Sequence, residues 1–175
     1  MYRLMWLLMG ILVALNCRGA DCDWPQYGHD AARTFQTNDQ VAPPLEMQWM
    51  LGASVVQSAV ADQENLYVTA QPLGQAEASW LLSLSLVTGQ PKWILEDAHG
   101  QSAGVRGALL LAIQEEWLYA CRSDGVYALA KDDGRVLWVK KTGEAVPIQV
   151  VPDGQNLYVA TVNYAAHGGR HVSCL

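Results

Sequence analysis

Short apolar runs separated by polar turns recur from about residue 55 onward. Runs such as GVYALA (residues 125–130) and RVLWVK (residues 135–140) are rich in β-branched and aromatic side chains, which is typical of strands. The residues between them, KDDG, supply a turn in which Gly134 can adopt a positive φ. No long helical periodicity follows the apolar N-terminus. The pattern predicts an all-β chain.

The strand pattern repeats along the chain. LLSLSLVTGQPKW (residues 81–93) aligns without a gap to VYALAKDDGRVLW (residues 126–138), and Trp49 lies 44 residues before Trp93. A second series, ENLYVTA, EWLYACR and QNLYVAT, predicts another strand, which precedes the two strands around the turn. A further run of apolar or small residues comes before each member of this series. Each unit thus offers four strands. A four-stranded unit every ~40 to 50 residues is typical of β-propeller blades.

One Gly and one Trp recur in each unit. We expect Gly89 and Gly134 to close tight hairpins, because Gly adopts positive φ without strain. A single blade buries its faces only against neighbouring blades. We therefore expect Trp49, Trp93 and Trp138, on the outermost strands, to dock each blade on the next.

The repeat resembles the blade motif Ala-x-Asp-x-x-Thr-Gly-Lys-x-x-Trp of the quinoprotein, or PQQ-type repeat, family. Residues 83–93 keep the Thr, Gly and Trp but have Ser for Ala and Asp. Residues 128–138 keep the Ala, Gly and Trp but have Ala for Asp and Arg for Lys. The chain is similar to exported PQQ-like repeat proteins and to the propeller lipoprotein of the outer-membrane β-barrel assembly machine. The resemblance implies an incomplete β-propeller of four-stranded PQQ-like blades.

The expected organisation has five parts. They are a signal peptide (1–20), an N-terminal clasp with an outer closing strand (21–54), two blades (55–96 and 107–140) and a partial blade (147–175). Residues 46–51 match an outer strand without the three that should precede it. Two and a half blades are fewer than the roughly 4 to 8 of known propellers. We therefore expect a truncated member, with assembly of several chains or a compact three-blade arc as the alternatives.

The stretch DWPQYGHDAART (residues 23–34) gathers two aromatic residues, a Pro, a Gly, a His and two Asp, as an active site could. Members of the resembled family often begin with Trp-Pro-x-Tyr-Gly-x-Asp, and Trp24, Pro25, Tyr27 and Gly28 match this pattern. Pro fixes φ and Gly permits a sharp bend. We interpret the stretch as a structural clasp, with the two aromatic rings packed across the outer surface of the propeller or its closure.

The N-terminus predicts export. The run LMWLLMGILVAL (residues 4–15) is too short for a membrane span but fits a signal peptide, so a secreted or periplasmic protein is expected. Lipid attachment at Cys17 and an uncleaved anchor are the alternatives. The formal net charge of −6, without a basic stripe, argues against nucleic acid as a partner.

Candidate chemistry is sparse. Quinoprotein dehydrogenases bind pyrroloquinoline quinone with calcium, and Arg106 and Asp124 could be offered to such a site. His167, His171 and Cys174 could form part of a metal site, although a loop between strands is the simpler interpretation. We assign no catalytic, cofactor or metal residue.

The sequence thus leads to a functional expectation and an alternative. The expectation is a non-catalytic interaction or scaffold module whose partners are proteins or additional blades. The alternative is a fragment of a PQQ-dependent alcohol or sugar dehydrogenase.

Overall fold

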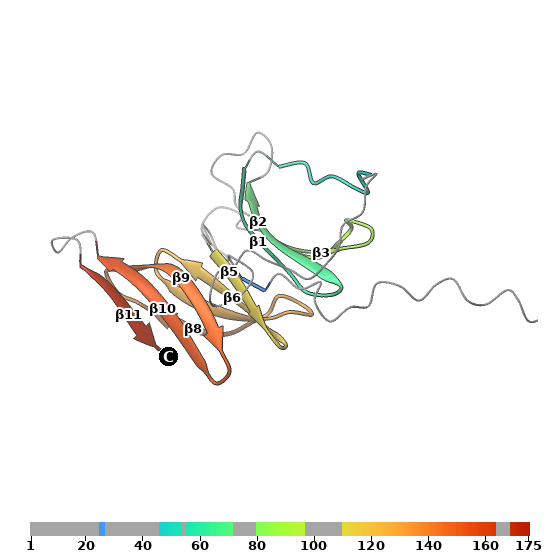
Figure 1. The fold of residues 1–175 in the computed structure, drawn as a ribbon. Coiled ribbons are helices and arrows are strands. Elements are labelled where there is room, and N and C mark those ends of the chain that lie inside the picture. The colour runs from blue at the N-terminus through green and yellow to red at the C-terminus, as the bar shows by residue number, and fades with distance from the viewer. Residues whose placement is uncertain (1–24, 27–45, 54, 72–79, 97–109, 164–168) are drawn as a thin grey trace, which may run out of the picture.

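The computed structural model describes residues 25–26, 46–53, 55–71, 80–96, 110–163 and 169–175. Regular structure in these residues consists of strands that form three antiparallel sheets (Figure 1). The first sheet contains β1 (Val55–Ala61), β2 (Asn65–Gln71), β3 (Trp80–Ser85) and β4 (Pro91–Glu96). The second contains β5 (Leu110–Gln114), β6 (Trp117–Arg122), β7 (Gly125–Ala130) and β8 (Val136–Lys141). The third contains β9 (Ala145–Asp153), β10 (Asn156–Asn163) and β11 (Arg170–Cys174).

The sheets are arranged as the blades of an incomplete β-propeller. In each sheet every strand pairs with the next one along the chain, and β1, β5 and β9 are the first strands. These first strands contact one another, β1 with β5 and β5 with β9. The three sheets therefore meet along their inner strands, and we call them the first, second and third blades.

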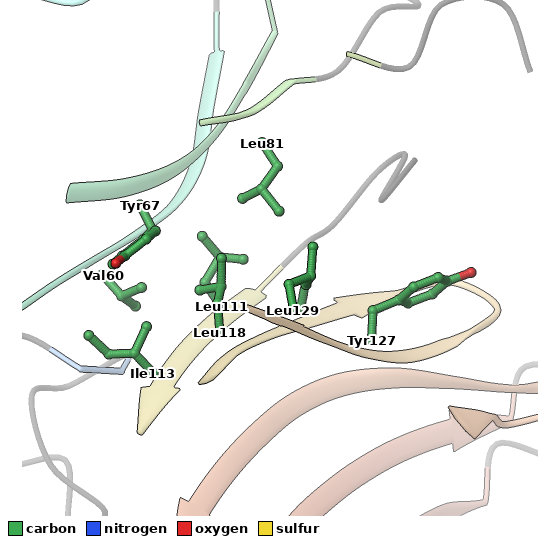
Figure 2. Close-up of a cluster of buried hydrophobic side chains, with 9 residues drawn as sticks. Val60, Tyr67, Leu81, Leu111, Ile113, Leu118, Tyr127 and Leu129 are labelled. Carbon is green, nitrogen blue, oxygen red and sulfur yellow. The ribbon is translucent and has the colours of Figure 1, made fainter. Parts of the chain in front are cut away.

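Apolar side chains fill both spaces between blades. Val60, Tyr67 and Leu81 of the first blade meet Leu111 and Leu118 of the second in one buried cluster (Figure 2). Another cluster joins the second and third blades. Its buried members are Ala112, Cys121, Val126, Val150, Leu157 and Val159. Burial of apolar surface between neighbouring blades is what holds such a repeat fold together.

The hairpin turns of the first two blades have the same geometry. Gly89 donates to the carbonyl of Ser85 at 2.8 Å, and Gly134 donates to that of Ala130 at 3.0 Å. Both glycines have positive φ, 68° and 73°, where other residues are strained. Ser85, which replaces the Asp of the resembled motif, accepts a 3.3 Å bond from the Thr88 N–H.

Two local predictions were wrong. Residues 46–51, predicted as an outer strand, have no ladder partner in the part of the chain that the structure describes. Leu51 and Ala53 instead pack against the outer face of the first blade. Residues 170–174, interpreted as a loop when considered as metal ligands, instead form β11, which pairs with Tyr158 to Val162 of β10 as the third strand of the partial blade. The expected signal peptide, and Trp24, Tyr27 and Gly28 of the clasp, lie outside the described residues.

Candidate functional site

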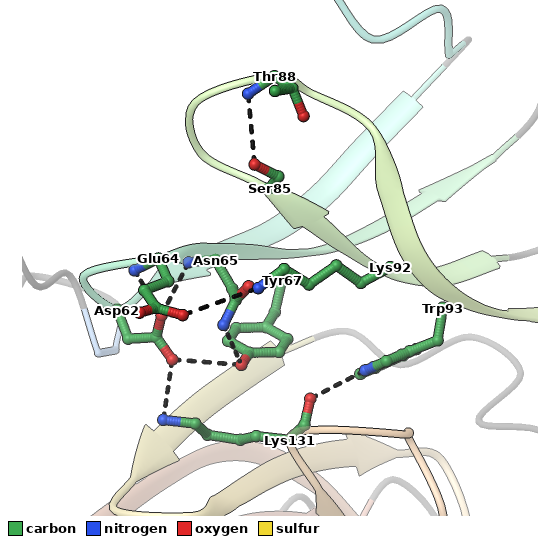
Figure 3. Close-up of polar contacts among 9 residues, drawn as sticks. All are labelled: Asp62, Glu64, Asn65, Tyr67, Ser85, Thr88, Lys92, Trp93 and Lys131. Carbon is green, nitrogen blue, oxygen red and sulfur yellow. Dashed lines mark hydrogen bonds and ion pairs between the residues drawn. The ribbon is translucent and has the colours of Figure 1, made fainter.

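The contact between the first and second blades is built around Trp93. Its indole Nε1 donates to the carbonyl oxygen of Lys131, in the turn of the second blade, at 2.8 Å (Figure 3). Its ring lies 6.1 Å from the ring of Tyr67. A Cβ at Gly134 would come within 2.9 Å of Trp93 Cε3, closer than real Cβ contacts allow. The turn therefore needs Gly both for its φ and for the space that the indole occupies.

Trp49 repeats this arrangement one blade earlier. Its Nε1 donates to the carbonyl oxygen of Leu86 at 2.8 Å, and a Cβ at Gly89 would lie 2.5 Å from its Cδ2 atom. Leu86 and Lys131 hold the same place in the two turns. Trp49 thus makes the contact of an outer-strand residue although its segment is not part of a sheet.

Trp138, on β8, has different neighbours. Its ring lies 6.5 Å from that of Trp117 and 6.2 Å from that of Tyr119. The three aromatic rings line a hollow of about 350 Å³, together with Gly154, Leu157 and other residues of the third blade. No turn glycine of the described residues packs on this indole. Of the three repeated Trp residues, two therefore dock on a turn and the third lines a hollow.

A polar network lies beside the Trp93 contact, on the same inter-blade face. Asp62 Oδ2 and Lys131 Nζ form an ion pair at 2.8 Å, and both side chains are about one-sixth exposed (16% and 17%). The Tyr67 hydroxyl donates to Asp62 Oδ2 at 3.2 Å. The other oxygen of Asp62 accepts from the backbone N–H groups of Glu64 and Asn65, at 3.0 and 2.8 Å. Asp62 thus orders the β1–β2 turn and ties it to the second blade (Figure 3).

The network shifts the ionisation of its members. Burial would raise the pKa of Asp62, but the hydrogen bonds from Lys131 and from the backbone of Glu64 and Asn65 outweigh it and hold the pKa below 3.8. Burial and the negative charge of Asp62 raise the pKa of Tyr67. At neutral pH the carboxyl is therefore ionised and the phenol is protonated.

A pocket of about 630 Å³ opens next to this network. Residues of both blades line it, including Asp62, Asn65, Tyr67 and Lys131. The Asn65 Oδ1 atom is buried and has no hydrogen-bond partner among the described residues. Pro25, whose carbonyl accepts from the Ile113 N–H at 2.7 Å, also lines the pocket.

The clasp residue Pro25 thus lies at the inner strand β5, where Gln26 also pairs with Ala112. Gln26 is buried, with 7% of its surface exposed. The packing expected for Trp24 and Tyr27, on the outer surface or the closure, falls outside the described residues. This inner contact could not be predicted from the sequence, because the pattern carries no signal for pairing across some 86 residues.

Asp124 forms ion pairs and a hydrogen bond within the second blade. Its carboxylate pairs with Arg122 Nε at 3.0 Å and with the ammonium of Lys141, and it accepts from the Tyr127 hydroxyl at 3.0 Å. Burial would raise the pKa of Asp124, but the bonds from Lys141 and Tyr127 lower it overall. Arg106, the other residue offered to a quinone site, lies outside the described residues.

The described cysteines and histidine, Cys121, Cys174 and His171, do not lie together at one site. Cys121 is fully buried, and burial raises the pKa of its thiol to about 12. His171 and Cys174 are three residues apart on β11, so they lie on opposite faces of the sheet. His167 lies outside the described residues.

The resembled dehydrogenases require calcium ligands for their quinone. Among the described residues, no group of three or more His, Cys, Asp or Glu side chains is placed to hold a metal ion. Asp124, the described acid considered for this role, is held by Arg122 and Lys141. Asp124 is therefore engaged by two cationic side chains, and no described residue is assigned to a calcium–quinone site.

Solved structures include proteins that the chain resembles in fold. No family model and no curated protein matches the sequence. The chain is similar to the crystal structure of BamB from Moraxella catarrhalis, with a TM-score of 0.45 and 16% sequence identity, over 61% of this chain and 32% of that one. The chain thus spans about a third of the BamB chain. No helix in the described ranges is long and apolar enough to cross a membrane. The arrangement of its own sheets makes this chain an incomplete β-propeller.

Proposed function

We propose that the chain is an exported, non-catalytic interaction module of the PQQ-like repeat type. The observation that supports this best is the use of the repeated side chains. Trp49 and Trp93 are both bonded to turn carbonyls of the next blade, and Gly89 and Gly134 make room for their rings. These four recurring residues therefore serve blade docking. The surfaces left over are available for protein partners or additional blades.

The charged groups between strands support the same proposal. A general acid or base needs a titratable group that is free to exchange protons near the operating pH. Asp62 and Asp124 are instead bound by Lys131 and Lys141, and both pKa values are lowered. These carboxylates stay ionised at neutral pH and act as links between structural elements.

Titration with pyrroloquinoline quinone and Ca²⁺ tests the non-catalytic role. Purified protein is titrated with pyrroloquinoline quinone and Ca²⁺, and bound quinone is followed by absorbance after removal of free ligand. We expect no stoichiometric uptake and no oxidation of alcohols or sugars. Asp124→Asn serves as the matched variant, and we expect it to behave like the parent protein. Uptake of one quinone per chain with substrate oxidation, reduced in Asp124→Asn, would establish the dehydrogenase alternative and overturn the proposal.

Export has a separate test. The run of residues 4–15 and the small residues near Gly19 and Ala20 support cleavage by a signal peptidase. Expression of the full sequence in a bacterium should yield a mature protein outside the cytoplasm, shortened by about 20 residues in intact mass. Inserting charge with Leu12→Arg should keep the uncleaved chain in the cell, whereas Leu12→Ile should not. A full-length cytoplasmic product from the parent sequence would contradict export.

A further inference from the structure

The outer edge of β11 differs from the corresponding edges of the first two blades. Strands β3 and β7 are each paired on both sides, whereas β11 pairs only with β10 among the described residues. All five residues of β11 are exposed. An exposed strand edge presents unpaired N–H and C=O groups that can accept a further strand.

The strand register identifies which residues of the three blades are equivalent. Leu157 and Leu175 exchange backbone hydrogen bonds of 3.1 and 2.9 Å, and the pairs Leu66↔Leu84 and Leu118↔Leu129 hold the same place in the other blades. Three residues before these leucines come Leu81, Val126 and Val172. Leu81 and Val126 are 2% and 0% exposed, but Val172 is 73% exposed.

Val172 therefore occupies a core position on an uncovered sheet face. Tyr158 lies on the same face of β10 and is 38% exposed, whereas its equivalent Tyr67 is fully buried under the second blade. This face has the composition of a blade interface. Its covering surface is not found in the described residues.

Residues 46–53 hold the place of an outer strand but have no strand partner among the described residues. Trp49 makes the blade-docking contact that Trp93 makes from β4, but no sheet includes its segment. Met47 and Met50, which flank Trp49, are each 80% exposed. Leu51 faces the first blade, in contact with the cluster that includes Val68 and Leu82. The segment is thus placed as the outer strand of a preceding blade, and no other strand of such a blade lies beside it among the described residues.

We propose that β11 of one copy accepts residues 47–53 of a second copy as its fourth strand. The two complete blades predict the register. Ser83 pairs with Trp93, and Ala128 pairs with Trp138. Ser83 and Ala128 directly precede Leu84 and Leu129, the leucines that are equivalent to Leu175. The same rule pairs Cys174 with Trp49. Ser173 then pairs with Met50, and Val172 with Leu51.

This register pairs both the free edge of β11 and the segment of residues 47–53. Because the backbone of Leu175 is bonded to Leu157 on β10, the alternate residues Val172 and Cys174 direct their N–H groups to the free edge. The incoming strand would bond these groups. Val172 would lie next to Leu51 and be covered by the first blade of the second copy. The exposed apolar face of the third blade and the unpaired segment would both be buried.

The contact is head to tail, with different surfaces on the two copies. Such contacts close into rings or continue as chains. Association between copies does not require the absence of catalysis, so quinone uptake and the association of copies can be measured independently. The occupant is a second copy because the chain itself carries both the acceptor edge and a strand segment with the matching docking Trp.

Disulfide trapping tests the register. Two proteins are prepared with Cys17, Cys22 and Cys174 replaced by Ser, one carrying Met50→Cys and the other Ser173→Cys. These positions form a non-hydrogen-bonded pair in the proposed register, where side chains are closest. Mixing under mild oxidation should give a covalent dimer of the two proteins. The control mixture of Met50→Cys with Val172→Cys, which lies on the opposite face, should give at least tenfold less.

Sedimentation provides the second measurement. The parent chain should sediment as an oligomer at tens of micromolar, and Val172→Pro, which removes an outward N–H, should shift it to monomer. Val172→Thr should remain associated. If Val172→Pro does not fold, the trapping pair still decides, because Met50 and Ser173 are both exposed. A monomeric parent chain with no excess of the in-register disulfide would overturn the proposal.

Discussion

Replacing Trp93 by alanine should lower the free energy of unfolding by about 3 kcal/mol, because the indole joins the first two blades. Large-to-small aromatic substitutions in a core cost ~3–5 kcal/mol, and the lower end applies because Trp93 is only half-buried. The substitution also leaves the Lys131 carbonyl without the 2.8 Å bond from Nε1. Urea denaturation followed by circular dichroism gives the change directly.

Two further variants separate the components of this contact. Trp93→Phe keeps a ring on Gly134 but loses the N–H donor, so it should cost about 1 kcal/mol beyond the loss of ring area. Gly134→Ala should also destabilise by about 2 kcal/mol, because alanine is strained at φ 73° and its Cβ would lie 2.9 Å from the indole. A Trp93→Ala change below about 0.5 kcal/mol, the usual size of a neutral surface substitution, would show that the blades do not depend on this contact.

Removal of the Asp62 carboxylate should have the second largest effect. Asp62→Ala leaves the Lys131 ammonium and the Tyr67 hydroxyl without their acceptor in a site where the side chains are about one-sixth exposed. It also removes the acceptor for the N–H groups of Glu64 and Asn65. Breaking one partner of a buried pair costs ~3–5 kcal/mol, and we expect about 2 to 3 here because the pair is not fully buried.

The control for Asp62 is a double variant. Lys131→Met fills much of the same volume without charge, so Asp62→Asn combined with Lys131→Met should recover at least half of the loss measured for Asp62→Ala. Thermal and urea unfolding of the parent protein and these variants completes the comparison. Equal stability of Asp62→Ala and the parent protein would contradict a structural role for the network.

The lowered pKa of Asp62 also predicts how stability depends on pH. The folded pKa lies below the usual 3.8, so the folded state binds fewer protons than the unfolded state in acid. The contribution of Asp62 is complete above about pH 5 and is lost as the pH falls through 3.8 toward the folded pKa. The parent protein and Asp62→Ala should therefore converge in stability between about pH 5 and pH 2. A difference that stays constant over this range would contradict the ionised pair.

The blade contacts could be predicted only in part from the sequence. The spacing of Gly89 and Trp93, repeated at Gly134 and Trp138, predicted hairpins and docking residues, because turn geometry and strand register are local properties. It did not predict that Trp138 would lie among aromatic rings instead of on a turn. That outcome depends on which surface stands opposite β8.

The polar network could not be predicted. Asp62 and Lys131 are 69 residues apart and belong to different repeats. Gln114 and Leu86 hold their equivalent positions in the other complete blade, and only the third blade repeats the acid, as Asp153. Only the packing of two blades places the β1–β2 turn beside the next hairpin. The same holds for Pro25 on β5, which joins segments that no short-range pattern connects.

The sequence by itself determined the all-β character and the four-strand unit, because side-chain alternation and turn residues act over a few neighbours. The tertiary structure decided how those units meet. It placed Trp49 in an outer-strand contact without a sheet and left Val172 exposed at a core position, because both depend on the surface that an adjacent blade supplies. A local pattern specifies a strand, whereas its burial depends on a neighbour that lies elsewhere in the chain or on another copy.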